Sequence, residues 1–288
     1  METLPVPAPA TLSDYERRAL REIALWKSPD RMGWFGDLVT RVNRTLHDAT
    51  ELIRKLPGVD WTIDNVVSGI LRLTNEVVHD SVWREGIYRE YRAAGHPVHG
   101  PADVQALRLE AVDEVLGGLD TKYRALAAAQ GAAAGYAGAA GILPDVLGLV
   151  ALNLRAVGEH AATCGFDVAD PHERYFALQI LNLVSQPTDA SKQAALVPLI
   201  RVSHAVARQQ TVQTVEQYAF VGAIRNAARA LGLRLTGAKA AQILPMTSAL
   251  VGGGFNAYYT SKVCDAAYFL YRERWLIQKH GAEAVQAA

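Results

Sequence analysis

The side chains best suited to chemistry in this sequence are polar groups set into apolar helical segments. Asp145 follows Pro144 at the expected start of a helix, where a carboxylate can accept hydrogen bonds from free backbone N–H groups. Arg155 lies in a segment that is apolar nearly all round, so we expect a buried guanidinium, with Glu159 one turn on as the local candidate partner. Asn256 shares a helical face with apolar residues. Each side chain is either a satisfied structural group or a polar group in a ligand cavity.

Two more candidates lie on the first predicted helix. Ser13 and Glu16 form the sequence pattern of a capping box, which predicts that the helix begins there. Trp26 belongs to the apolar stripe of this helix, and Glu22 flanks the stripe at its edge. Both residues are placed to meet partners inside a helical bundle.

The common catalytic and metal-binding motifs are absent from the sequence. There is no GxSxG, no GxGxxG, no Walker A motif and no HExxH. Cys164 and Cys264 lack CxxC partners, so we expect both to pack as small apolar side chains. Glu76 and His79 form a single ExxH pair, whereas di-iron bundles use two such pairs and two further glutamates. We therefore predict no metal and no cofactor.

Composition excludes some classes of protein. The 288 residues contain 29 Lys and Arg and 29 Asp and Glu, a balance that argues against nucleic-acid binding. Two cysteines exclude a disulfide scaffold and fit a reducing compartment. Hydrophobic residues make up 50% of the chain, which suits a large apolar core. Residues 1–10 have no basic region or apolar core of the kind that a signal peptide needs.

Hydrophobic periodicity predicts an all-α fold, a bundle of about ten helices. No segment alternates apolar and polar residues over the length of a strand. We expect a disordered lead over 1–10, a single helical domain over 11–280 and a disordered tail over 281–288. After the first helix, which Pro29 follows, the expected helices are at about 34–56, 62–92, 102–116, 120–139, 144–164, 172–184, 190–209, 212–231, 237–250 and 255–279.

Two long uncharged runs raise the question of a membrane. Residues 125–144 and 240–261 carry no charge, and about 20 apolar residues suffice to span a bilayer. Both runs are rich in Ala and Gly, which gain little from lipid. The triplet Ile142-Leu143-Pro144 recurs as residues 243–245, each after an Ala/Gly-rich approach. The recurrence is either a chance similarity or a pair of small-residue hairpins at the centre of the fold, and we predict the pair. We expect a peripheral association with membranes, the alternative being a hairpin that enters the bilayer part of the time.

Three groups of residues form a recognisable pattern along nearly the whole chain: Tyr15-Glu16, Glu22-Ile23 and Trp26-Lys27, then Gly141, Pro144-Asp145, Leu152, Leu154-Arg155 and Gly165-Phe166-Asp167, and finally Pro245, Gly252, Gly254-Phe255-Asn256, Phe269 and Arg272-Glu273-Arg274-Trp275-Leu276. Together they resemble the EcsC family of bacterial proteins. The resemblance runs from Tyr15 to about Trp275, with departures from the family pattern at Cys164 and at Met246-Thr247. It implies an all-helical, cytoplasmic or membrane-peripheral protein with no established reaction and no catalytic residues to carry over.

Three functional hypotheses follow, of which the first is a binding protein for a hydrophobic or lipid-like small molecule. We place it in the cytoplasm or peripherally on the inner membrane face, where a membrane surface or membrane protein is a further partner. The second is a hydrolase or isomerase that uses Asp145 or Glu22 as acid or base on an apolar substrate. The third is a scaffold or regulator of a membrane transporter. The candidate ligand-binding residues are Glu22, Trp26, Asp145, Arg155 and Asn256.

Overall fold

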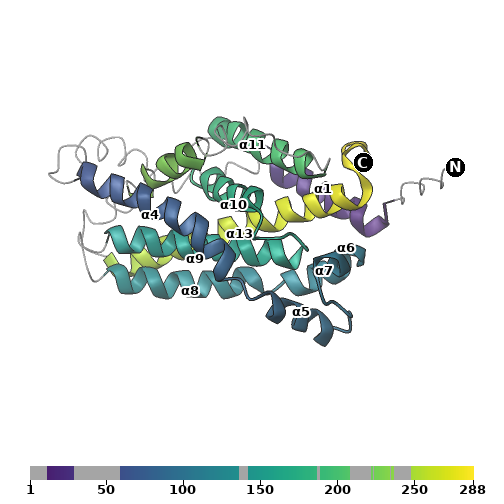
Figure 1. Ribbon diagram of the computed structural model, residues 1–288. Coiled ribbons are helices and arrows are strands. Elements are labelled where there is room, and N and C mark those ends of the chain that lie inside the picture. The colour runs from purple at the N-terminus through teal and green to yellow at the C-terminus, as the bar shows by residue number, and fades with distance from the viewer. Residues whose placement is uncertain are drawn as a thin grey trace, which may run out of the picture.

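The chain folds from helices alone over the residues that the structure describes, so the predicted all-α class is confirmed (Figure 1). The computed structural model describes residues 12–28, 59–135, 142–186, 189–207, 222, 224–233, 235–236 and 248–288. The helices are α1 (Asp14–Lys27), α4 (Val59–Asp80), α5 (Arg84–Ala93), α6 (Pro101–Ala106), α7 (Leu109–Leu116), α8 (Leu119–Gly135), α9 (Ile142–Thr163), α10 (Pro171–Val184), α11 (Asp189–Ala207), α13 (Ser248–His280) and α14 (Ala282–Gln286).

The 33-residue helix α13 runs through the middle of the molecule and packs against α1, α8, α9, α10 and α11 (Figure 1). The sequence predicts a break between helices 237–250 and 255–279, but α13 continues through residues 251–254. A Cβ atom on Gly253 would lie 3.0 Å from the backbone oxygen of Ala128 in α8. The small residues therefore let two helix backbones approach closely, and this packing outweighs the low helix propensity of glycine.

Four consecutive residues of α13 contact four different neighbours. Successive side chains on a helix point about 100° apart, so a short run can reach elements on every side. Arg272 binds α7, Glu273 binds α1 and Arg274 binds α10. Trp275 donates a hydrogen bond from Nε1 to the carbonyl of Val104 in α6, at 3.4 Å. This part of α13 therefore fixes the positions of the helices around it.

Helix α1 begins as the sequence predicts and lies along the C-terminal part of α13. Ser13 and Glu16 form the predicted capping box, with the Ser13 Oγ accepting from the Glu16 amide at 3.1 Å. Glu16 also lies 3.1 Å from Nε2 of His280, near the end of α13. Burial alone would raise the pKa of the Glu16 carboxyl. The hydrogen bonds that this carboxyl makes with Ser13 and His280 outweigh burial, so its pKa is lowered. The start of α1 is thus held by charge as well as by apolar contacts.

Three other sequence predictions differ from the structure. The helix expected over 62–92 is interrupted after α4, and α5 begins only at Arg84. The helix expected over 102–116 is two helices, α6 and α7, that meet at Leu107 and Arg108. The tail expected to be disordered contains α14, which follows Gly281 at a φ of 87°. Left-handed backbone of this kind suits glycine, so the chain turns sharply between α13 and α14.

Several predictions lie outside the described residues. They are the lead 1–10, the helix at 34–56, and the start of the second small-residue hairpin at 240–247; of the expected helix 212–231, only 222 and 224–231 are described. The described part of the chain contains no helix with both the length and the hydropathy that crossing a bilayer requires.

Candidate functional site

Asp145 and Asn256 come together where α8, α9 and α13 meet. Asn256 is fully buried and donates from Nδ2 to the Asp145 carboxylate at 3.0 Å. Gln130 in α8 donates to the backbone carbonyl of Asp145 at 3.3 Å. A Cβ atom on Gly148 would lie 2.6 Å from the Gln130 amide nitrogen, so the glycine makes room for this contact. The two predicted residues therefore form a buried polar link between helices.

This link gives a first prediction about stability. Asn256→Ala removes a donor from a buried carboxylate and is expected to lower the free energy of unfolding by about 1–3 kcal/mol. Arg155→Met, on an exposed face, is the matched control and is expected to change it by less than about 0.5 kcal/mol. Chemical denaturation of both variants measures the difference. Equal stability of the Asn256 variant and the parent would contradict a structural role for the amide.

Arg155 is exposed, although the sequence predicts a buried guanidinium at this position. Its side chain is 45% exposed, and its Nε lies 3.5 Å from Oε1 of Glu159, the expected partner. Glu159 is nearly buried and also accepts a hydrogen bond from Lys122 of α8 at 2.6 Å. The prediction of burial was wrong because α9 is not enclosed on all sides, and Arg155 lies on the side that faces solvent. The buried part of the helix is not wholly apolar either, since it includes Asn153 and His160.

Glu22 belongs to a second polar cluster, the α1–α7–α13 network, made of Tyr15, Glu22, Asp113 and Arg272. Arg272 is 2% exposed and donates to Asp113 at 2.8 Å and to Glu22 at 3.2 Å. The hydroxyl of Tyr15 donates to the same oxygen of Asp113 at 2.7 Å. The guanidinium also lies over the ring of Tyr268, 4.5 Å from its centroid. Because Glu22 is 57% exposed, the network reaches from the interior to solvent.

Asp113 is the member of this network that sequence reasoning missed. Burial raises the pKa of its carboxyl, although the guanidinium of Arg272 acts in the opposite direction. Burial also raises the pKa of Tyr268 to about 12, so this ring stays neutral beside Arg272 at pH 7. A single Asp on an amphipathic helix carries no signal that its partner lies 159 residues further along the chain. No spacing rule could have found the pair.

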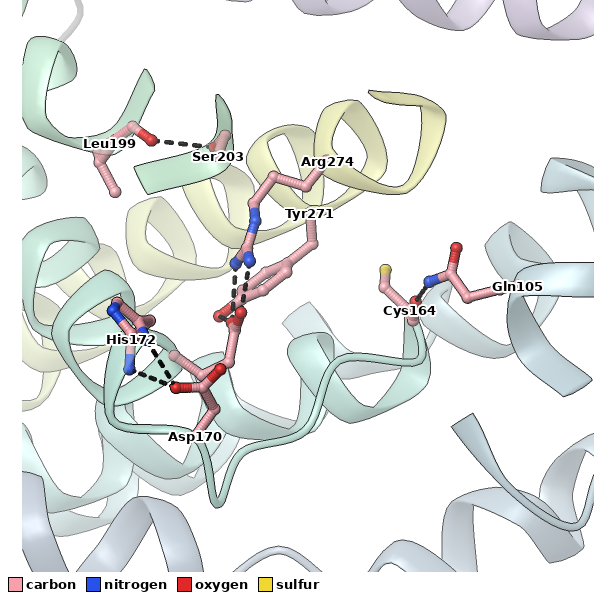
Figure 2. Close-up of polar contacts among 9 residues, drawn as sticks. Gln105, Cys164, Asp170, His172, Leu199, Ser203, Tyr271 and Arg274 are labelled. Carbon is pink, nitrogen blue, oxygen red and sulfur yellow. Dashed lines mark hydrogen bonds and ion pairs between the residues drawn. The ribbon is translucent and has the colours of Figure 1, made fainter. Parts of the chain in front are cut away.

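Arg274 and Glu173 form a third polar cluster, which is wholly buried. Arg274 holds the carboxylate of Glu173 with two hydrogen bonds, one of them 2.7 Å long, and Tyr271 donates to the same carboxylate at 3.2 Å (Figure 2). The guanidinium also lies 4.2 Å from the ring centroids of Phe166 and of Phe176. With its charge paired and its faces covered by rings, this cluster joins α10 to α13 and is structural.

Trp26 lies on the side of α1 that faces α13. Its ring stacks on Phe269, with the centroids 5.3 Å apart. The contact between the two helices continues next to this stack, since Lys27 forms an ion pair with Glu273, one helical turn after Phe269. Gln193 of α11 donates to the backbone carbonyl of Lys27 at 3.1 Å and so ties α11 to the end of α1. These contacts build one wall of a cavity.

The cavity lies between α1, α11, α13 and the segment around α14, and has a volume of about 380 Å³. These elements gather at the end of the molecule where the C-terminus lies (Figure 1). The walls are mostly apolar, and none of the five predicted site residues lines them. The lining residues are Leu20, Arg21, Ile23, Ala24, Lys27, Ile200, Ser203, Glu273, Ile277, Val285, Gln286 and Ala288.

The described residues contain no cluster of three or more His, Cys, Asp or Glu side chains that could hold an ion. Glu76 and His79 lie in α4, but their side chains are outside the described residues. Cys164 and Cys264 are buried, as predicted, and burial raises the pKa of both thiols, which keeps them protonated.

These helices and their cavity define an all-helical protein built around one long central helix. The chain belongs to the EcsC protein family, which matches residues 43–276. It is also similar to the uncharacterized protein YdbA of Bacillus subtilis (strain 168), with 23% identity over 266 residues that cover 90% of this chain and 92% of YdbA. Comparison with solved structures finds no match. The expected resemblance is thus confirmed, although the family match begins after α1 and leaves Glu22 and Trp26 outside it.

Proposed function

We propose that this protein binds a hydrophobic or lipid-like small molecule in the cavity between α1, α11, α13 and α14. The observation that carries the proposal is the cavity itself, which combines apolar walls with a few polar groups, as ligand sites do. Ile23 and Ile277 supply apolar surface from two helices, and Lys27 and Glu273 supply a paired charge in the same wall. A cytoplasmic or membrane-peripheral location suits a ligand of this kind.

The size of the cavity limits the ligand. Small-molecule sites have volumes of about 300–1,000 Å³, so a volume of 380 Å³ lies near the lower end of the range. A site of this size suits a single alkyl chain or a small ring system better than a two-chain phospholipid. Leu20 of α1 and Ile200 of α11 add to its apolar surface.

Ala24 offers a direct test of the proposal. Its side chain is exposed to the cavity, so Ala24→Trp fills the space without displacing a buried residue. We expect the variant to bind an environment-sensitive apolar fluorophore at least about tenfold more weakly, a loss of about 1.4 kcal/mol. A fluorescence titration of the full chain with 1-anilinonaphthalene-8-sulfonate measures this change.

The control is the same substitution at an exposed helical alanine away from the cavity. Ala125 in α8 is exposed and does not line the cavity, so Ala125→Trp is expected to bind the fluorophore as the parent does. Far-UV circular dichroism checks that both variants keep their helices. If the Ala24 variant is folded and binds the fluorophore as tightly as the parent, the cavity is not the binding site and the proposal is wrong.

A further inference from the structure

Three charged side chains line the cavity. Arg21 and Lys27 carry positive charge, and Glu273 carries the one negative side-chain charge in the lining. Lys27 and Glu273 are paired with each other and are each about one-fifth exposed. Arg21 is exposed and makes no ion pair with a described residue, so its guanidinium is available at the edge of the cavity.

We propose that the ligand is a free single-chain amphiphile with an anionic head group, a carboxylate or a phosphate monoester, held by Arg21. This inference rests on the proposed function and names the chemical class of its ligand. The alkyl chain lies against Leu20, Ile23 and Ile277, and the head group lies at the exposed edge, where water can solvate it.

Arg21 is a better ligand for the head group than Lys27. Glu273 already neutralises Lys27, and an anion placed between them would have to separate the pair and would be repelled by the carboxylate. The guanidinium of Arg21 instead offers a planar fork of N–H donors that matches a carboxylate or phosphate. Charge complementarity therefore places the head group on the Arg21 side of the cavity.

The test compares ligands that differ only in the head group. Dodecanoate, dodecyl phosphate and dodecanol compete with the fluorophore for the full chain, at concentrations below micelle formation. We expect the two anions to bind about tenfold more tightly than the alcohol, the difference expected for a hydrogen-bonded charge at a partly exposed site. Arg21→Met should remove this preference while dodecanol binds as before.

Arg18→Met is the matched control, because Arg18 is an exposed arginine of the same helix that lies over Tyr15 and does not line the cavity. Like Arg21→Met, it removes one positive charge, but it should leave the tenfold preference for the anions over dodecanol unchanged. If both variants lose the preference equally, the effect comes from net charge and the inference is wrong.

The remaining outcomes separate the inference from the function on which it rests. If dodecanol and dodecanoate bind the parent equally, the anionic head group is wrong but the cavity still binds an apolar molecule. If neither competes, the proposed function fails as well. A third arm uses vesicles of anionic phospholipid. If Arg21→Met weakens vesicle binding but leaves dodecanoate binding unchanged, Arg21 contacts a membrane surface and the inference is overturned.

Discussion

Arg274→Met is expected to lower the free energy of unfolding by about 3–5 kcal/mol, because it leaves the carboxylate of Glu173 buried without a counter-charge. The two side chains are each almost wholly buried, and water cannot replace the lost hydrogen bonds. Of the donors that the described residues supply to the carboxylate, only Tyr271 would remain. Urea denaturation at neutral pH measures the loss.

The double variant Glu173→Leu/Arg274→Met is the control for this result. Replacing both charges by apolar groups removes the stranded carboxylate, so we expect the double variant to recover most of the stability that the single variant loses. If the single and double variants are equally destabilised, lost packing against Phe166 and Phe176 explains the effect and the account of a buried ion pair is wrong.

Arg272→Met is expected to cause a loss of similar size, about 3–5 kcal/mol at neutral pH, but one that depends on pH. The substitution leaves Asp113 with Tyr15 as its donor. Burial already raises the pKa of Asp113 in the folded protein, and loss of the guanidinium raises it further. The folded variant therefore keeps this proton to a higher pH than the unfolded chain does, and its stability falls as the pH rises through that window.

The measurement is the free energy of unfolding of the Arg272 variant and of the parent between about pH 4, near the ordinary pKa of Asp, and pH 8. We expect the difference between the two proteins to be small at the acid end and to grow as the pH rises. The double variant Asp113→Asn/Arg272→Met should show no such growth. A loss that is constant with pH would contradict the pairing of Arg272 with Asp113.

Local sequence patterns predicted the features that depend on nearby residues. The capping box at Ser13 and Glu16 fixed the start of α1, and the position of Asn256 among apolar residues predicted its burial. The pairing of Arg155 with Glu159 was also predicted, because the two lie one turn apart. These features follow from contacts within a few residues along the chain.

The break between α4 and α5 could not be predicted from periodicity. Ile70 in α4 and Tyr88 in α5 are both buried, and their separation corresponds to about five turns of a helix. Both residues would therefore share one face of an uninterrupted helix. The apolar pattern continues in phase across the interruption at residues 81–83, so it contains no sign that the helix ends.

The candidate site could not be predicted because its parts are far apart in the sequence. Ile23, Ile200 and Ile277 meet at one cavity, although each is an ordinary apolar residue of its own helix. Arg21 is likewise an ordinary exposed arginine until α13 and α14 are placed beside α1. Sequence reasoning favoured Asn256 and Arg155 as ligand-binding residues, but the structure bonds Asn256 to Asp145 of another helix and exposes Arg155 beside Glu159.

The most direct test of the proposed function is a titration of the full chain with dodecanoate, followed by NMR of isoleucine δ1-methyl groups labelled with carbon-13. Ile23, Ile200 and Ile277 line the cavity, whereas Ile87 and Ile180 are buried in α5 and α10 away from it. We predict saturable shifts of the three cavity methyl signals and none of the other two. Shifts at Ile87 or Ile180 with none in the cavity, or no shifts at all, would contradict binding in this cavity.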